Sequence, residues 1–120
     1  MSTPRHRLEL PWWEPWSLTR ALTRHGGREG LVLLEGDGSA FGQRAVLGID
    51  PIELVRCQGL PGEVGATDPF AALADLERRG GPWLGWLAYE AGAWVEPAEH
   101  WRPSDMATLW AARHDPLIHF

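Results

Sequence analysis

The 120-residue sequence has a single cysteine, no long apolar run and no cluster of basic residues. With Cys57 alone, the chain can form neither an internal disulfide nor a cysteine-based zinc site. No segment approaches the roughly 20 apolar residues of a membrane-spanning helix, and the start lacks the apolar core of a secretory signal. The net charge of -5 disfavours nucleic acid and anionic membranes as partners. We therefore expect a cytoplasmic protein with a flexible leader at 1–7 and one small domain at 8–120.

Tryptophan, by contrast, is plentiful. The chain has eight: Trp12, Trp13, Trp16, Trp83, Trp86, Trp94, Trp101 and Trp110. Large aromatic side chains are mostly buried in folded proteins, so the sequence favours a bulky, tryptophan-rich core. The alternative is a set of exposed indoles that binds a carbohydrate or a partner protein.

Two segments have the features of helices. One begins at Glu14-Pro15 and has an apolar stripe at Leu18, Ala21, Leu22 and His25. We expect Thr19, Arg20, Thr23 and Arg24 to face water, and Gly26-Gly27 to end this helix. The second begins with Asp68 as its N-cap and Pro69 in its first turn, and it ends at Gly80-Gly81.

About six short segments are typical of strands: 31–35, 43–50, 52–57, 83–89, 107–113 and 117–120. Only Asp50-Pro51 separates the second from the third, which predicts that these two are antiparallel neighbours. Together with the two helices, the strands predict an α+β fold built on a largely antiparallel sheet.

The strand at 83–89 is the centre of the predicted fold. It places Trp83, Gly85 and Leu87 on one face and Leu84 and Trp86 on the other, so both faces are apolar. The strands at 31–35 and 45–49 are also apolar on both faces, whereas two helices can cover only one side of the sheet. The chain therefore either dimerises or belongs to a larger protein that supplies a second layer.

The sequence offers little that resembles catalytic chemistry. Gly36-x-Gly38 is followed by a predicted strand, not by the helix that a phosphate loop requires, and it is interpreted as a hairpin turn. The five histidines lack the spacing of a metal site, and no nucleophile motif surrounds a serine. Glu35 and Glu90 each close an apolar strand, where a solvated or salt-bridged carboxylate is favoured over one that binds a cation. We therefore assign no catalytic residue, metal ligand or cofactor to this chain.

Three blocks of sequence resemble the N-terminal region of component I of anthranilate synthase and aminodeoxychorismate (para-aminobenzoate) synthase. The first has Leu33-Leu34-Glu35 where the family has Leu-Leu-Glu-Ser, followed by 42–51, which is similar to Gly-Arg-Tyr-Ser-Phe-Ile-Gly-Ala-Asp-Pro. The second, 81–96, resembles the segment around Gly-Tyr-Leu-Ser-Tyr-Asp-Leu-Gly. The third, 105–115, resembles a stretch with Trp-x-x-Arg-Tyr-Asp.

The resemblance implies part of an enzyme that uses chorismate. In that family the N-terminal region packs with a larger C-terminal chorismate-binding domain in a two-sheet sandwich, and the catalytic and magnesium-binding residues belong to the C-terminal domain. This chain would then be a scaffold or regulatory domain that is inactive alone. In the full enzyme, a glutamine amidotransferase subunit would supply ammonia.

The resemblance also implies a regulatory tryptophan pocket at Leu34, Glu35 and Gly36. Gly36 stands where the family has serine, so a hydroxyl that could bind the ligand is absent. This difference favours aminodeoxychorismate, in the folate branch, over anthranilate. A different interpretation of the whole chain is a stand-alone tryptophan-rich module that binds a carbohydrate, a small amino acid or a partner protein.

Overall fold

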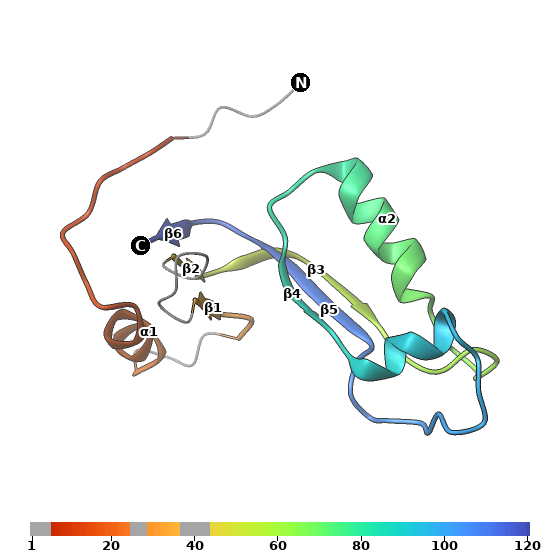
Figure 1. Ribbon diagram of the computed structural model, residues 1–120. Coiled ribbons are helices and arrows are strands. Elements are labelled where there is room, and N and C mark those ends of the chain that lie inside the picture. The colour runs from red at the N-terminus through yellow and green to blue at the C-terminus, as the bar shows by residue number, and fades with distance from the viewer. Residues whose placement is uncertain (1–5, 25–28, 37–43) are drawn as a thin grey trace.

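The computed structural model describes residues 6–24, 29–36 and 44–120 (Figure 1). It confirms the predicted fold class: six antiparallel strands and two main helices form an α+β fold, with the strands divided between two three-stranded sheets. Most of the predicted leader, the predicted helix stop at Gly26-Gly27 and the turn after Gly36 lie outside the described residues. No helix in the described ranges is long and apolar enough to cross a membrane.

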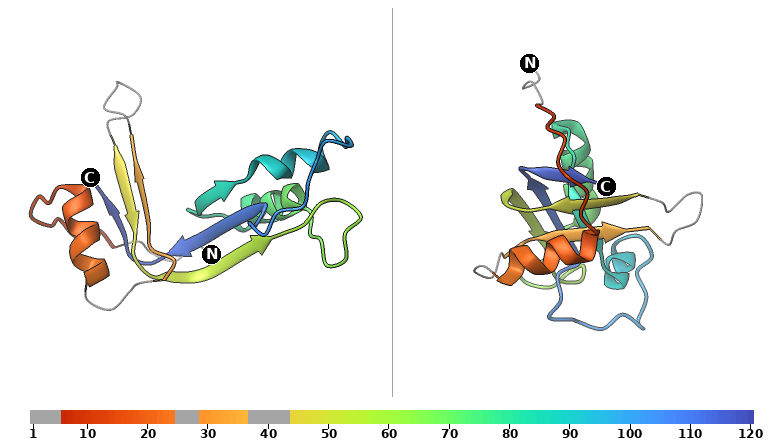
Figure 2. Two further views of the ribbon diagram at one scale, coloured as in Figure 1. Left: turned by 90° about the horizontal axis from the view of Figure 1, so that it is seen from below. Right: turned by 90° about the vertical axis from the view of Figure 1, so that its left-hand side faces the viewer.

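The first sheet has the order β1-β2-β6 and the second the order β3-β5-β4. The first contains β1 (Val32–Glu35), β2 (Ala45–Gly48) and β6 (Leu117–His119). The second contains β3 (Pro51–Cys57), β5 (Leu109–His114) and β4 (Leu84–Leu87). Figure 2 shows the sheets at opposite ends of an elongated molecule, with the chain crossing between them twice.

One long two-stranded ribbon runs through both sheets. β2 and β3 form one strand of it, β5 and β6 the other, and each bends where an Asp-Pro pair interrupts it. Two hydrogen bonds keep the ribbon paired at the bend, from Ile49 N to Pro116 O (3.3 Å) and from Asp115 N to Asp50 O (3.0 Å).

The prediction that 43–50 and 52–57 are antiparallel neighbours was therefore wrong. The short link continues the strand into the second sheet and does not reverse it. The physical reason lies in Pro51, which favours an extended conformation for Asp50 and has no N–H to close a hairpin turn.

Helix α1 (Pro15–Arg24) packs against β1 and β2 on the side of the first sheet that faces away from the second (Figure 2). The Glu14 carboxylate caps it by accepting from the backbone N–H groups of Trp16 (3.1 Å) and Ser17 (2.8 Å). Thr19 is buried, contrary to the sequence prediction, because its Oγ1 donates to Pro15 O (2.8 Å) and the hydroxyl needs no water.

Helix α2 (Pro69–Arg79) begins and ends as predicted, and it covers one face of the second sheet. Asp68 Oδ1 accepts from the N–H groups of Phe70 (2.9 Å) and Ala71 (3.3 Å), and Gly80 ends the helix with a φ of 74°. At that end, Glu53 of β3 pairs with Arg79 of α2 and with Arg113 of β5. These ion pairs fix the helix across the sheet.

The buried core is made mostly of small side chains. Its apolar members are Ala45, Leu47, Ile49, Cys57, Leu76, Ala91, Ala93, Ala107, Leu109, Ala111 and Ala112. None of the eight tryptophans, all of which lie in the described ranges, is fully buried. The predicted tryptophan core was therefore wrong for this chain, because its compact interior admits alanine and leucine and leaves the indoles at its margins.

The strand predicted at 83–89 ends early, at Leu87. Its last ladder bond runs from Ala88 N to Thr108 O (2.8 Å), and Tyr89–Trp94 then forms a short 3-10 helix, η1. Ala91 and Ala93 of η1 are buried, and their burial stabilises the turn away from the sheet. Glu90 therefore lies in the first turn of η1 and does not close a strand.

We predict that Asp68→Ala lowers the free energy of unfolding by about 1 kcal/mol, or the melting temperature by about 4 °C, because it removes the N-cap of α2. Circular dichroism of the 120-residue chain measures the change. Glu77→Ala removes the same charge from the same helix without removing a cap, and it should have a smaller effect. Equal losses in the two variants would contradict the capping role.

A second prediction concerns Glu14, whose pKa is lowered by the Ser17 hydroxyl and by the N–H groups of Trp16 and Ser17. A lowered pKa means that the cap stabilises α1 above the pKa of the unfolded chain, about 4.3, and loses this effect as pH falls through the folded pKa. On acidification, the protection factors of the α1 amides, which correct for the change in the intrinsic exchange rate, should therefore fall. In Glu14→Gln this fall should disappear.

Candidate functional site

Two apolar grooves flank strand β4, one on each face of the second sheet. The α2 groove, of about 500 Å³, lies between α2 and β4. The β1 groove, of about 520 Å³, lies on the other face of the second sheet, between this sheet and residues 30–34, which include most of β1. Gly85 and Trp86 line both grooves, so β4 forms the wall between them.

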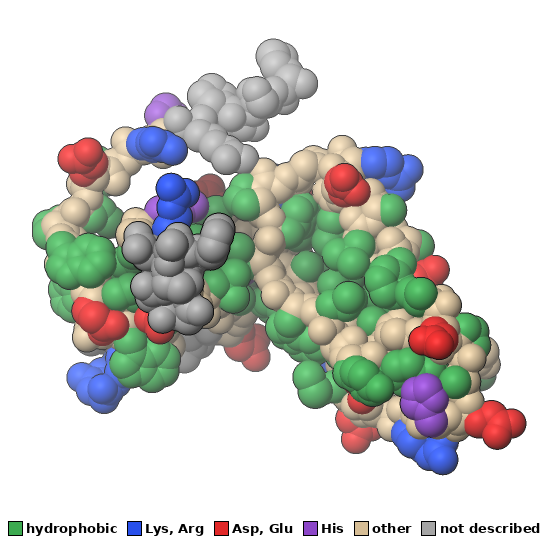
Figure 3. Space-filling view, in the orientation of Figure 1, with side chains coloured by type: hydrophobic (Ala, Val, Ile, Leu, Met, Phe, Trp, Pro, Cys, Tyr) green, Lys and Arg blue, Asp and Glu red, His purple; other side chains and the backbone are tan. Residues whose placement is uncertain are grey.

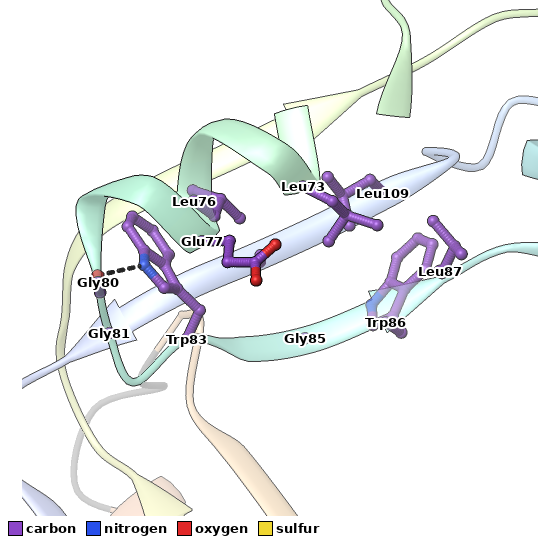
Figure 4. Close-up of a pocket in the computed structure, with 11 residues that line it drawn as sticks. Leu73, Leu76, Glu77, Gly80, Gly81, Trp83, Gly85, Trp86, Leu87 and Leu109 are labelled. Carbon is purple, nitrogen blue, oxygen red and sulfur yellow. Dashed lines mark hydrogen bonds between the residues drawn. The ribbon is translucent and has the colours of Figure 1, made fainter. Parts of the chain in front are cut away.

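The α2 groove has apolar walls and one acidic side chain (Figure 4). Its lining residues are Leu73, Leu76, Glu77, Gly80, Gly81, Trp83, Gly85, Trp86, Leu87, Leu109 and Ala111. The Trp83 indole is held in place because its Nε1 donates to Gly80 O (2.9 Å) and because the Arg79 guanidinium lies 5.1 Å from its ring centre. Figure 4 shows the Glu77 side chain between Trp83 and the two leucines, Leu73 and Leu109.

The face of the second sheet opposite α2 is open. In the strand register, Leu54 and Leu84 flank Ala112, while Arg56 and Trp86 flank Trp110, so the face carries one charge at the β3 side. We call Leu54, Leu84, Trp86 and Trp110 the open face. Leu54 is 50% exposed and Trp86 40%, and no helix of the described ranges covers them. The strand predicted at 83–89, which has two apolar faces, thus has one face beneath α2 and the other face without a covering helix.

The β1 groove adjoins this open face. Its lining residues are Gly30, Leu31, Val32, Leu33, Leu34, Gly85, Trp86 and Trp110, none of which carries a charge. Gly85 lets the strands approach closely, because a Cβ at this position would overlap the carbonyl oxygen of Trp110. The groove offers flat indole surfaces and branched aliphatic side chains, which suit an apolar or aromatic group.

Of the three residues predicted for a tryptophan pocket, only Leu34 lines a groove. Glu35 is exposed at the end of β1, opposite Ala45, and Gly36 N donates to Arg44 O (3.1 Å) beyond the strand. Trp110, which lines the same groove as Leu34, was not predicted from the sequence. The alternation of Trp110 with Leu109 and Ala111 hints at its direction, but no sequence pattern places it against β1.

The buried titratable groups have structural surroundings. His114 is buried where the two sheets meet, with its Nε2 atom 2.6 Å from Gly30 O and its ring against Gly48. Cys57 is buried in the core beneath α2. Among residues 6–24, 29–36 and 44–120, no three His, Cys, Asp or Glu side chains are grouped as metal ligands would be.

Three comparisons complete the description of the site. No protein-family model, curated protein or solved structure matches this chain. Its function must therefore be inferred from the sequence motifs and from the grooves that β4 separates.

We predict that acrylamide quenches most of the tryptophan fluorescence of the isolated chain, because none of the indoles is fully buried. Stern–Volmer measurements on the native and the urea-unfolded chain give the comparison, and the two slopes should differ by less than about two-fold. Strong shielding in a monomer would contradict the exposure described above. Shielding in a dimer would mean that a second copy covers the open face.

Proposed function

We propose that this chain is the N-terminal scaffold domain of component I of a chorismate-utilising synthase, and that it is inactive alone. The single observation that carries the proposal is that three motif blocks meet in one groove. Leu34 comes from the first block, Trp86 from the second and Trp110 from the third, and all three line the β1 groove. Such convergence is expected if the motifs preserve one packing surface.

The size of the exposed surface supports a large partner. The chain exposes 8980 Å², whereas a compact protein of 13.4 kDa exposes about 6500 Å². Its radius of gyration is 16.8 Å, against about 13.5 Å for a compact chain of this length. The difference in area is of the size that obligate interfaces bury. We infer that the partner layer is the chorismate-binding domain that the resemblance implies.

In this proposal the chemistry belongs to the partner domain. That domain would bind chorismate and magnesium, and an amidotransferase subunit would deliver ammonia. This chain would contribute the open face as an apolar wall. Water is excluded from this wall once the partner domain covers it. The absence of a hydroxyl at Gly36 favours aminodeoxychorismate as the product, and para-aminobenzoate would follow in the folate branch.

A specific observation favours the second candidate, a tryptophan-rich binding module. Tyr89 is 76% exposed and its ring centre lies 5.1 Å from that of Trp101, which in turn lies 4.6 Å from His100. Exposed aromatic rings of this kind can stack on a sugar. This cluster lies outside both grooves, so the two candidates use different surfaces.

The proposal is tested with the product of the natural gene, isolated from its own cells. We expect a mass several-fold above 13.4 kDa and the conversion of chorismate, with ammonium and magnesium, to aminodeoxychorismate. A product of 13.4 kDa that leaves chorismate unchanged would overturn the proposal. Binding of a soluble oligosaccharide, lost in Tyr89→Ala, would then support the binding module.

Matched leucine variants test the role of the open face. Leu54 and Leu10 are 50% and 58% exposed, but only Leu54 belongs to the open face. Leu54→Asp should reduce the chorismate-amination rate at least ten-fold, because it buries an unpaired charge against the partner layer. Leu10→Asp should change the rate less than two-fold. A similar rate in both variants would show that this face packs against nothing the activity requires.

A further inference from the structure

Among the described residues, strand β4 has one edge that no other strand pairs with. It lies at the end of the second sheet, next to β5. Because Ala88 N donates to Thr108 O, the alternation of an antiparallel ladder directs the N–H and C=O groups of Leu84 and Trp86 toward β5. The corresponding groups of Gly85 and Leu87 therefore point outward. They are free to pair with another strand.

The two outer strands of this sheet differ in how they are protected. Strand β3, at the other edge, has an irregularity between Pro51 and Glu53 and carries the charges of Glu53 and Arg56. Proline, bulges and charged side chains are the devices by which natural edge strands resist pairing. Strand β4 consists of Leu84, Gly85, Trp86 and Leu87 and has none of them. Its edge is thus the accessible one.

A strand added beside β4 would place its side chains alternately on the two faces of the sheet. One set would reach the α2 groove and the other would reach Trp86 and the β1 groove, and both grooves are lined mostly by apolar side chains. The α2 groove also contains the Glu77 carboxylate. The ion pairs of α2 join Asp75, Arg78 and Arg79, and Glu77 has no ion-pair partner among the described residues. A cation in the added strand would complete the groove.

We propose that the edge of β4 binds an extended peptide segment whose apolar side chains fill both grooves and whose single Lys or Arg pairs with Glu77. The backbone groups of Gly85 and Leu87 supply the hydrogen bonds of this strand addition. The proposal goes beyond the proposed enzyme because it assigns the edge of the sheet, although the peptide side chains that enter the β1 groove would contact Trp86 and Trp110 of the open face.

Charge argues against a second copy of this chain as the occupant. If two β4 strands paired with each other, each copy would present Leu84–Leu87, which contains no basic residue, to the other's Glu77. The two basic side chains at the end of α2 are already paired, Arg78 with Asp75 and Arg79 with Glu53 and Asp75. A self-paired dimer would leave both Glu77 carboxylates without a cation, whereas a peptide with one basic residue satisfies them.

The probe is a library of random heptapeptides displayed on phage and selected on the immobilised 120-residue chain. We expect enrichment of apolar, β-branched sequences with one Lys or Arg. A selected peptide, made synthetically, should bind at least ten-fold more weakly to Leu87→Lys, because lysine at an edge strand blocks pairing. Ile52→Lys, which alters an exposed aliphatic side chain on β3 at the opposite edge and outside both grooves, should change its Kd less than two-fold.

A charge variant tests the role of Glu77. Glu77→Gln should weaken the basic peptide about three-fold or more and leave its norleucine analogue unchanged. Circular dichroism confirms that each variant is folded. Hydrogen exchange of the unaltered chain provides a readout that needs no variant: the peptide should slow the Gly85 and Leu87 amides at least ten-fold, while the Trp86 amide is already protected without it.

Several results would overturn the proposal. They are the failure to enrich any peptide, equal effects of Leu87→Lys and Ile52→Lys, and slowed exchange at β3 in place of β4. A dimer of the 13.4 kDa chain in solution, in which the Gly85 and Leu87 amides are protected from exchange without peptide, would also overturn the proposal. The occupant of the edge would then be a second copy of the chain. None of these outcomes affects chorismate amination, so the proposed function would still be tested separately.

Discussion

The pairing of one long ribbon through its bend is the constraint on which the rest of the structure depends. The bonds between Ile49 and Pro116 and between Asp115 and Asp50 keep the two strands in register while both pass from one sheet to the other. His114 reinforces the bend, because its ring packs on Gly48 and its Nε2 contacts Gly30 O, 84 residues away in the sequence. β1 is added at one end of the ribbon and β4 at the other.

A bent ribbon gives two small sheets, and each helix covers one face of one sheet. The interior that results is narrow, so alanine and leucine fill it and the largest side chains remain at its margins. Figure 3 shows the consequence as hydrophobic side chains gathered on the surface around α2 and β4. Burying one such large side chain contributes about 1.5–3 kcal/mol, so covering the open face would stabilise the chain substantially.

Strand β4 is where these features meet. It separates the two grooves, presents Trp86 to the open face, and has an edge without the charges that protect β3. An apolar layer on the open face and an extended peptide at the edge would share Trp86 and Trp110, because these two residues belong to the open face and also line the β1 groove. The uncharged β1 groove and the acidic α2 groove would give such partners different specificities.

The sequence by itself determined the features that depend on near neighbours. Asp68, Pro69 and Gly80 fixed the ends of α2, the short apolar runs gave all six strands, and the two apolar faces of 83–89 indicated an uncovered layer. The candidate site was predicted only as far as Leu34.

Only the tertiary structure decided which strands pair, that Asp50-Pro51 continues a strand between sheets, that Thr19 is buried and that Glu90 belongs to η1. It also placed Trp86 and Trp110 against β1. The reason is physical: caps and turns are made by residues within a few positions of one another. Pairing and burial are decided instead by contacts between distant segments, such as those of Trp86 with Trp110 and of His114 with Gly30.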